Sequence, residues 1–173
     1  MERPTPTEAP LSLAQNQGFE DFFRREFVGL VALAEAVSGD PAAAEDLASE
    51  AMSRAHRSWP KISGYDKPGA WARRVTINLA HSRRRKRKRR DAFVRSHRAD
   101  QLVIAAPQAD HPVWAAVATL PDRQRAAIAL HYLEDLPVAE IAHILEISVS
   151  TATSHLHNAR TNLAELLAEG SNR

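Results

Sequence analysis

Eight consecutive basic side chains, Arg83 to Arg90, give this sequence its clearest chemistry, which is the binding of a polyanion. Between Arg54 and Arg98 there are 16 Lys and Arg against two acids, a local net charge of +14, whereas the rest of the chain carries −12. A chain polarised in this way presents one surface to a polyanion and others that repel it. Nucleic acid fits because cations that neutralise phosphates release counterions. A solvated tail, a localisation signal and a membrane-surface patch are the alternatives that the run alone leaves open.

The basic run closes a helix-patterned segment that carries other polar groups. Trp71, Val75 and Leu79 form its apolar stripe. A second stripe has spacings of 4, 3 and 4, so its members share one face: Arg74, Asn78, His81 and Arg85. A cationic groove with stacking and hydrogen-bonding groups is typical of proteins that bind single-stranded nucleic acid. Asn78 is the candidate for a base contact, because Asn has poor propensity in mid-helix. Trp71 lies on the apolar stripe, which favours a place in the core.

Helical periodicity dominates the elements that must position these side chains, and it predicts an all-α protein. Expected helices cover 19–37, 41–59, Pro68 into the basic run, 112–119, 121–133, the stretch after Leu136, and 149–168. They form two small helical domains joined by a flexible linker. The expected division is a disordered N-terminus at 1–17, a first domain at 18–90, a linker at 91–110 with a short apolar run at 102–104, and a second domain at 111–169.

The segment from Val138 to Arg160 has the form of a helix-turn-helix, with a short helix, a tight turn and a longer helix. Ser148 is well placed as the N-cap of the second helix. In this geometry the second helix enters the major groove, where short polar groups suit phosphates and base edges. Its outward face would carry Ser150, Thr151, Ser154, His155 and Asn158. An ordinary helical hairpin is the alternative.

Catalytic and metal chemistry find little support in the sequence. The chain has no Cys, and its eight His residues fall in no metal-ligand spacing. It lacks a Gly-rich phosphate loop and a nucleophile elbow. We therefore expect no enzyme activity, no metal and no cofactor. No apolar run approaches the length of a membrane span and the N-terminus does not resemble a signal peptide, so we expect a cytoplasmic protein without membrane contact.

Three segments together resemble the extracytoplasmic-function (ECF) sigma factors, small promoter-recognising subunits of bacterial RNA polymerase within the sigma-70 family. The first is Ala44–Glu50, the second is Ala70–Ala80 with the basic run, and the third extends from Leu120 to Arg160. The resemblance covers about residues 19–167. It implies a protein that binds core RNA polymerase, directs it to promoters and promotes strand opening, without making bonds itself.

The resemblance also implies roles for particular residues. Docking on the core polymerase would use Glu45, Asp46, Leu47 and Glu50. Contacts with the melted −10 element would come from Trp71, Arg74, Asn78, His81, Arg83, Arg84, Arg85 and Lys86. The double-stranded −35 element would be read by Ser148, Ser150, Thr151, Ser154, His155, Asn158 and Arg160. The loop at 63–66 would hold an unstacked base, and in the family an anti-sigma factor often holds the chain inactive.

The chain departs from the family pattern in its last two helices. Glu146 and Ser150 stand where the family often has Gly, and a left-handed non-Gly residue costs about 1 kcal/mol. Ala152, Thr153 and His155 replace Val and basic residues, so we expect weaker or altered −35 binding. The rival hypotheses are a stand-alone helix-turn-helix regulator, a nucleic-acid coating protein and a metal-dependent nuclease.

Overall fold

The computed structural model describes residues 12–97 and 112–170, and every regular element within those ranges is a helix. The first range holds α1 (Leu13–Ser38), α2 (Pro41–Arg57), α3 (Trp59–Ile62) and α4 (Pro68–His97). The second holds α5 (Pro112–Thr119), α6 (Asp122–Tyr132), α7 (Val138–Leu145) and α8 (Val149–Gly170). The predicted all-α class is confirmed. None of the helices in these ranges combines the length and the apolar content that crossing a bilayer requires.

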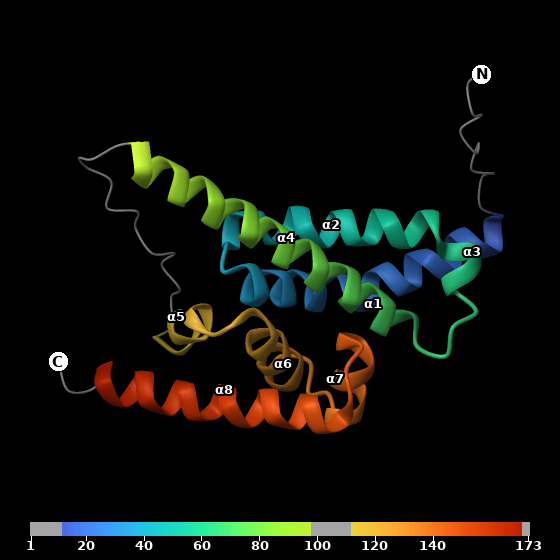
Figure 1. The fold of residues 1–173 in the computed structure, drawn as a ribbon. Helices are drawn as coiled ribbons and strands as arrows, with labels where there is room; N and C mark the ends of the chain where they lie inside the picture. Colours follow the sequence, from blue (N-terminus) through green and yellow to red (C-terminus); the bar gives the residue numbers. More distant parts are fainter. Residues whose placement is uncertain (1–11, 98–111, 171–173) are drawn as a thin grey trace, which may run out of the picture.

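The first three long helices, α1, α2 and α4, pack around one core (Figure 1). A capping box starts α1, in which the backbone N–H of Gln15 donates to Ser12 Oγ over 3.3 Å. Gly39 ends the helix with φ 63°, a left-handed conformation that glycine adopts without steric cost. Pro41 then opens α2, because its fixed φ suits the first turn of a helix. This short connection lets α2 pack along α1 and places its acidic side chains outward.

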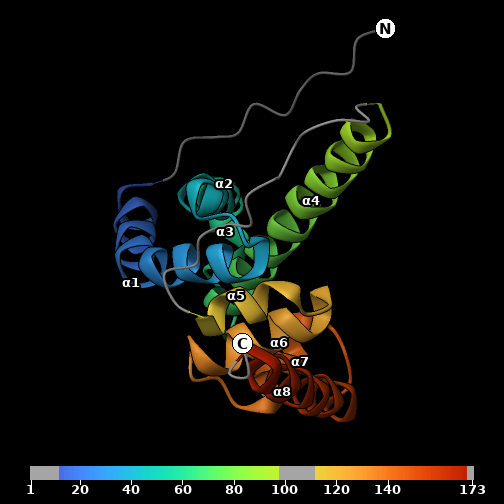
Figure 2. The same cartoon turned by 90° about the vertical axis from the view of Figure 1, so that its left-hand side faces the viewer.

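Helix α4 is longer than the sequence pattern predicts. The apolar periodicity fades at residue 90, which led us to expect a linker from 91, but α4 continues to His97. Residues 91–97 contain neither Gly nor Pro, so nothing in their chemistry stops a helix that is already formed. The distal part of α4 projects away from both groups of helices (Figures 1 and 2). The apolar run at 102–104 lies outside the described residues.

Helices α7 and α8 form the predicted helix-turn-helix, with buried Ala142 and Ala152 where the two helices pack. Ser148 caps α8 as expected, because its Oγ accepts a hydrogen bond from the backbone N–H of Thr151 at 3.1 Å. Glu146 ends α7 with φ 55° and ψ 46°, which is the left-handed region. The structure therefore meets the condition under which a side chain at this position is strained.

The two groups of helices pack against each other. Helices α5 and α6 contact α1, and α7 contacts the first half of α4. Figure 2 shows the C-terminal helices as a layer beneath α1 and the start of α4. At the junction Arg125 of α6 is fully buried and donates a hydrogen bond from Nη1 to the carbonyl oxygen of Val37 on α1, at 3.0 Å. Hydrophobic and polar contacts thus join residues that are far apart in the chain.

Candidate nucleic-acid interface

The predicted polar stripe of α4 is divided between solvent and protein. Asn78 and Arg85 are exposed, whereas Arg74 is half-buried and His81 is only 8% exposed. All four lie on one face of the helix, so helical geometry does not explain the difference. The difference arises because the C-terminal helices cover one edge of that face. Half of the predicted stripe is therefore free to meet a ligand.

Arg74 is bound to the end of α7 through all three guanidinium nitrogens. Its Nε donates to the carbonyl oxygen of Ile144 at 3.0 Å, and Nη2 donates to that of His143 at 2.8 Å. The third nitrogen, Nη1, forms an ion pair with Glu146 at 2.6 Å. The last carbonyls of a helix carry partial negative charge and lack partners within the helix, so a guanidinium satisfies both needs.

Arg84 and His81 make the next contacts along α4. Arg84 Nη1 donates to the carbonyl oxygen of Ala118 at 3.1 Å, and its Nε lies 3.1 Å from Asp122 Oδ1. His81 Nε2 lies 3.2 Å from the carbonyl oxygen of Asp122. Because a carbonyl oxygen can only accept, Nε2 must carry the proton. Burial lowers the pKa of His81, while the charge of Asp122 opposes that shift and the charges of Arg123 and Arg125 add to it.

Acidification should destabilise this packing through His81. Its pKa is lowered in the folded chain, so below about pH 6.5 the unfolded chain takes up a proton that the folded chain resists. The free energy of unfolding should therefore fall between pH 7.5 and 5.5, by at most about 1.4 kcal/mol per pH unit from this residue. Urea unfolding at both values, for the wild type and His81→Gln, checks the effect. An equally steep fall in the variant would show that His81 is not its source.

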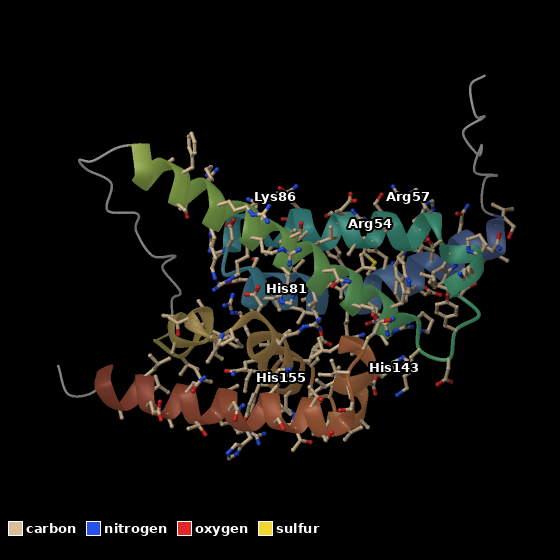
Figure 3. The ribbon with its side chains drawn as sticks, viewed as in Figure 1. Arg54, Arg57, His81, Lys86, His143 and His155 are labelled. Carbon is tan, nitrogen blue, oxygen red and sulfur yellow. The ribbon has the colours of Figure 1, made fainter. Side chains whose placement is uncertain are left out.

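The distal part of the basic run remains open to solvent. Arg85, Lys86, Arg89 and Arg90 are exposed, and Figure 3 shows Lys86 on the side of α4 away from the C-terminal helices, whereas His81 lies between α4 and those helices. Arg83 and Arg87 are anchored on Asp40, at 3.1 Å and 3.8 Å. A projecting helix with several free cations can bind a phosphate backbone without further rearrangement.

A recess of about 540 Å³ lies where the loop before α4 meets α7. Tyr65, Lys67, Trp71 and Arg74 line it from the N-terminal side, and Glu140 and His143 line it from α7. Lys67 Nζ is paired with Glu140 at 2.7 Å across it. Tyr65 lies within the loop at 63–66 that is predicted to hold an unstacked base, whereas Lys67 is not among the predicted site residues. The sequence does carry a signal for both residues, because an exposed aromatic side chain and a cation in a loop next to a basic helix suit base stacking and phosphate binding.

The acidic face of α2 points into solvent. Glu45, Asp46 and Glu50 are exposed, and Glu50 is paired with Arg54 within the same helix at 2.8 Å. Leu47 is 9% exposed and packs in the core. Leu47 therefore fixes the helix in place, while its acidic neighbours are available to a partner.

The outward face of α8 carries the polar side chains expected there. Exposed are Ser148, Ser150, Thr151, Ser154, Asn158 and Arg160, while His155 is half-buried. Ser148 Oγ lies 2.9 Å from Ser150 Oγ and 2.7 Å from Thr151 Oγ1, so the three hydroxyls are mutually ordered. Arg160 Nε donates to the hydroxyl of Tyr132 at 3.1 Å. The helix thus presents a neutral polar surface with one anchored cation at its far end.

Comparison with protein families agrees with this arrangement. The family model described as Sigma-70 region 2 matches residues 22–90, and the one described as Sigma-70, region 4 matches residues 111–163. Among solved structures, the sigma factor RpoE from Bartonella quintana, in complex with the anti-sigma factor NepR, has the same fold. Its TM-score is 0.68 at 24% identity, over 88% of this chain and 98% of that one.

Two curated relatives support the same family. The ECF RNA polymerase sigma factor SigW of Bacillus subtilis is 29% identical over 73% of this chain and 76% of its own length. The RNA polymerase sigma-E factor of Streptomyces coelicolor is 30% identical over 86% of this chain and 85% of its own length. With both regions matched in order and relatives covered along most of their length, this chain belongs to the ECF sigma factors of the sigma-70 family.

Proposed function

We propose that this sigma factor binds bacterial core RNA polymerase through α2 and promoter DNA through α4 and α8, and so directs initiation to its own promoters. The observation that carries the proposal is the separation of charge within one chain. An exposed acidic face on α2, a projecting cationic helix α4 and a neutral polar face on α8 occupy different elements. Each surface suits a different partner, and complementary charge selects partners by attracting one and repelling another.

The proposed division of labour follows the chemistry of each surface. Asn78, Arg85 and Lys86 would hold the displaced strand of the −10 element, because cations bind its phosphates and an amide can bind a base edge. The hydroxyls of α8 would read the double-stranded −35 element. Opening the duplex unstacks bases at a cost of a few kcal/mol, which cationic contacts offset. Bond formation would belong to the polymerase, in the cytoplasm, and the chain would act as a regulator.

The two region matches, at 22–90 and 111–163, support a division into a −10 domain at 18–90 and a −35 domain at 111–169. When one chain joins two DNA-binding domains of modest affinity, binding of the first raises the effective concentration of the second at the DNA, and the combined affinity rises. We propose an anti-sigma factor as a further partner, since RpoE of Bartonella quintana forms a complex with the anti-sigma factor NepR.

Run-off transcription tests the proposal directly. Purified core polymerase is supplied with random promoter-length DNA, with and without this chain. The expected result is a set of transcripts that start only in its presence, downstream of two shared sequence blocks at a fixed spacing. Symmetric sites recovered by direct DNA binding, with no stimulation of transcription, would instead indicate a stand-alone helix-turn-helix regulator.

A further inference from the structure

We propose that a recess between α4, α6 and α8 is a binding site for a small anion that carries a diphosphate group. This junction recess has a volume of about 530 Å³. Its charged lining consists of Arg84 and Lys88 of α4, Asp122 and Arg123 of α6, and His155 of α8. The inference goes beyond the proposed function and does not depend on it, because it concerns a ligand of the free chain.

Positive charge is buried in excess beside the junction recess. Arg84 is 8% exposed and Arg125 is fully buried. Both guanidinium groups lean on the same carboxylate oxygen, since Arg84 Nε lies 3.1 Å and Arg125 Nη2 lies 3.9 Å from Asp122 Oδ1. A buried charge is costly unless it is paired. One carboxylate cannot neutralise two guanidinium ions, so an additional anion would stabilise this cluster.

Arg84 lines the recess with a donor that is not hydrogen-bonded. Its Nη1 donates to the carbonyl oxygen of Ala118 at 3.1 Å. Its Nε is buried and, although close to Asp122, makes no hydrogen bond with any described residue. Burial lowers the pKa of Arg84, and the charge of Arg87 adds to that shift while Asp122 opposes it. Buried donors normally have an acceptor, and an anion in the recess would supply one.

Two exposed cations lie at the same recess. Lys88 makes no ion pair with a described residue, and Arg123 donates from Nη1 to the carbonyl oxygen of Leu145 at 3.3 Å. The first turn of α6 forms part of the wall, and the N-terminus of a helix carries partial positive charge. Guanidinium and ammonium groups form strong charge-assisted hydrogen bonds with phosphate oxygens. Cations from two helices and a helix N-terminus therefore converge on one hollow.

The size and lining of the junction recess favour a small ligand over a nucleic-acid duplex. Small-molecule sites occupy roughly 300 to 1,000 Å³, and the recess falls within that range. Leu120 and Pro121 line it beside the cations, so a ring of the ligand would find apolar surface. Arg84 is too deeply buried to meet the phosphates of a stiff duplex, whereas a free anion can approach it. Several cations can hold two linked phosphate groups better than one.

Isothermal titration calorimetry of the full chain tests the site with three probes: pyrophosphate, guanosine diphosphate and orthophosphate. Pyrophosphate should bind at one molecule per chain, and orthophosphate should bind at least fivefold more weakly. Tighter binding of guanosine diphosphate than of pyrophosphate would identify the ligand as a nucleotide. Equal binding would identify the diphosphate group alone as the ligand. If neither diphosphate binds, the proposal is wrong.

Single substitutions assign the binding to the junction recess. Lys88→Gln and Arg123→Gln should each weaken pyrophosphate binding about tenfold, because each removes a charge-assisted contact. Both side chains are exposed, and circular dichroism verifies that the variants fold. Lys86→Gln is the matched control, since it removes the same charge from α4 on the side away from the C-terminal helices (Figure 3). Equal losses in all three variants would indicate general attraction to the basic run and overturn the proposal.

Duplex DNA of random sequence provides the remaining comparison. Lys88→Gln and Arg123→Gln should weaken its binding no more than Lys86→Gln does. If they weaken DNA binding more strongly than pyrophosphate binding, the recess belongs to the DNA surface and the proposal fails. These measurements need neither polymerase nor a promoter, so a failure of the sigma-factor function in run-off transcription would leave their outcome unchanged.

Discussion

Replacement of Arg125 by methionine should lower the free energy of unfolding by about 3 kcal/mol. Arg125 is fully buried and donates to the carbonyl oxygens of Val117, Leu120 and Val37. Methionine fills much of the same space but has no N–H, so these buried acceptors lose their partners. Replacing a buried ion by an apolar side chain can be neutral when its partners are replaced too. The partners of Arg125 are backbone carbonyls, which a substitution cannot remove. Leaving them without hydrogen bonds should therefore cost more than the apolar side chain gains.

The charge of Arg125 does not change this expectation at neutral pH. Burial lowers its pKa to about 10, and the neighbouring cation of Arg84 contributes to the shift. The guanidinium is still protonated at pH 7.5, so all its N–H groups are available. Urea unfolding followed by circular dichroism measures the loss. Arg123→Met is the control, because Arg123 is exposed and donates to one carbonyl oxygen only, that of Leu145 at 3.3 Å. A loss below about 1 kcal/mol for Arg125→Met would contradict the assigned role.

Local chemistry in the sequence predicts most of the helices and two of the three surfaces. Gly39, Pro41 and Ser148 act as the predicted helix end, start and cap, because capping depends on neighbouring residues only. The acidic face of α2 and the polar face of α8 follow from helical period and are exposed as expected. The predicted end of α4 is too early, because apolar periodicity indicates which residues are buried and not which residues are helical. A helix that leaves the core loses its apolar stripe without ending.

Helical periodicity could not predict the burial and the contacts of Arg74, His81 and Arg84. Each is half-buried or buried by residues about 34 to 72 positions away, and no local pattern encodes such a contact. Arg125 was missed for the same reason, since its neighbours in the chain do not reveal that it reaches Val37. The sequence does contain one indication of the role of Arg125. An Arg within a run of buried apolar positions must find acceptors, because burying an unpaired charge is costly.

Charge reversal on α2 should have the largest effect on polymerase binding. Asp46→Arg is expected to weaken binding to core polymerase roughly 100-fold, since placing like charges together costs several kcal/mol. Asp46 is exposed, and no ion pair with another described residue anchors it to the fold, so the helices should remain intact. Affinity can be measured by titrating labelled sigma factor with core enzyme, and circular dichroism verifies the fold.

Asp21→Arg is the matched control for this substitution. Asp21 is also exposed on a helix, and its nearest cation, Arg24, lies 3.8 Å away, so the reversal changes net charge by the same amount at a similar structural cost. If both variants bind polymerase equally weakly, long-range attraction is responsible and α2 is not the docking face. If only Asp46→Arg fails, the loss is local. Binding to single-stranded DNA should then be unchanged, because Asp46 and the exposed cations of α4 belong to different surfaces.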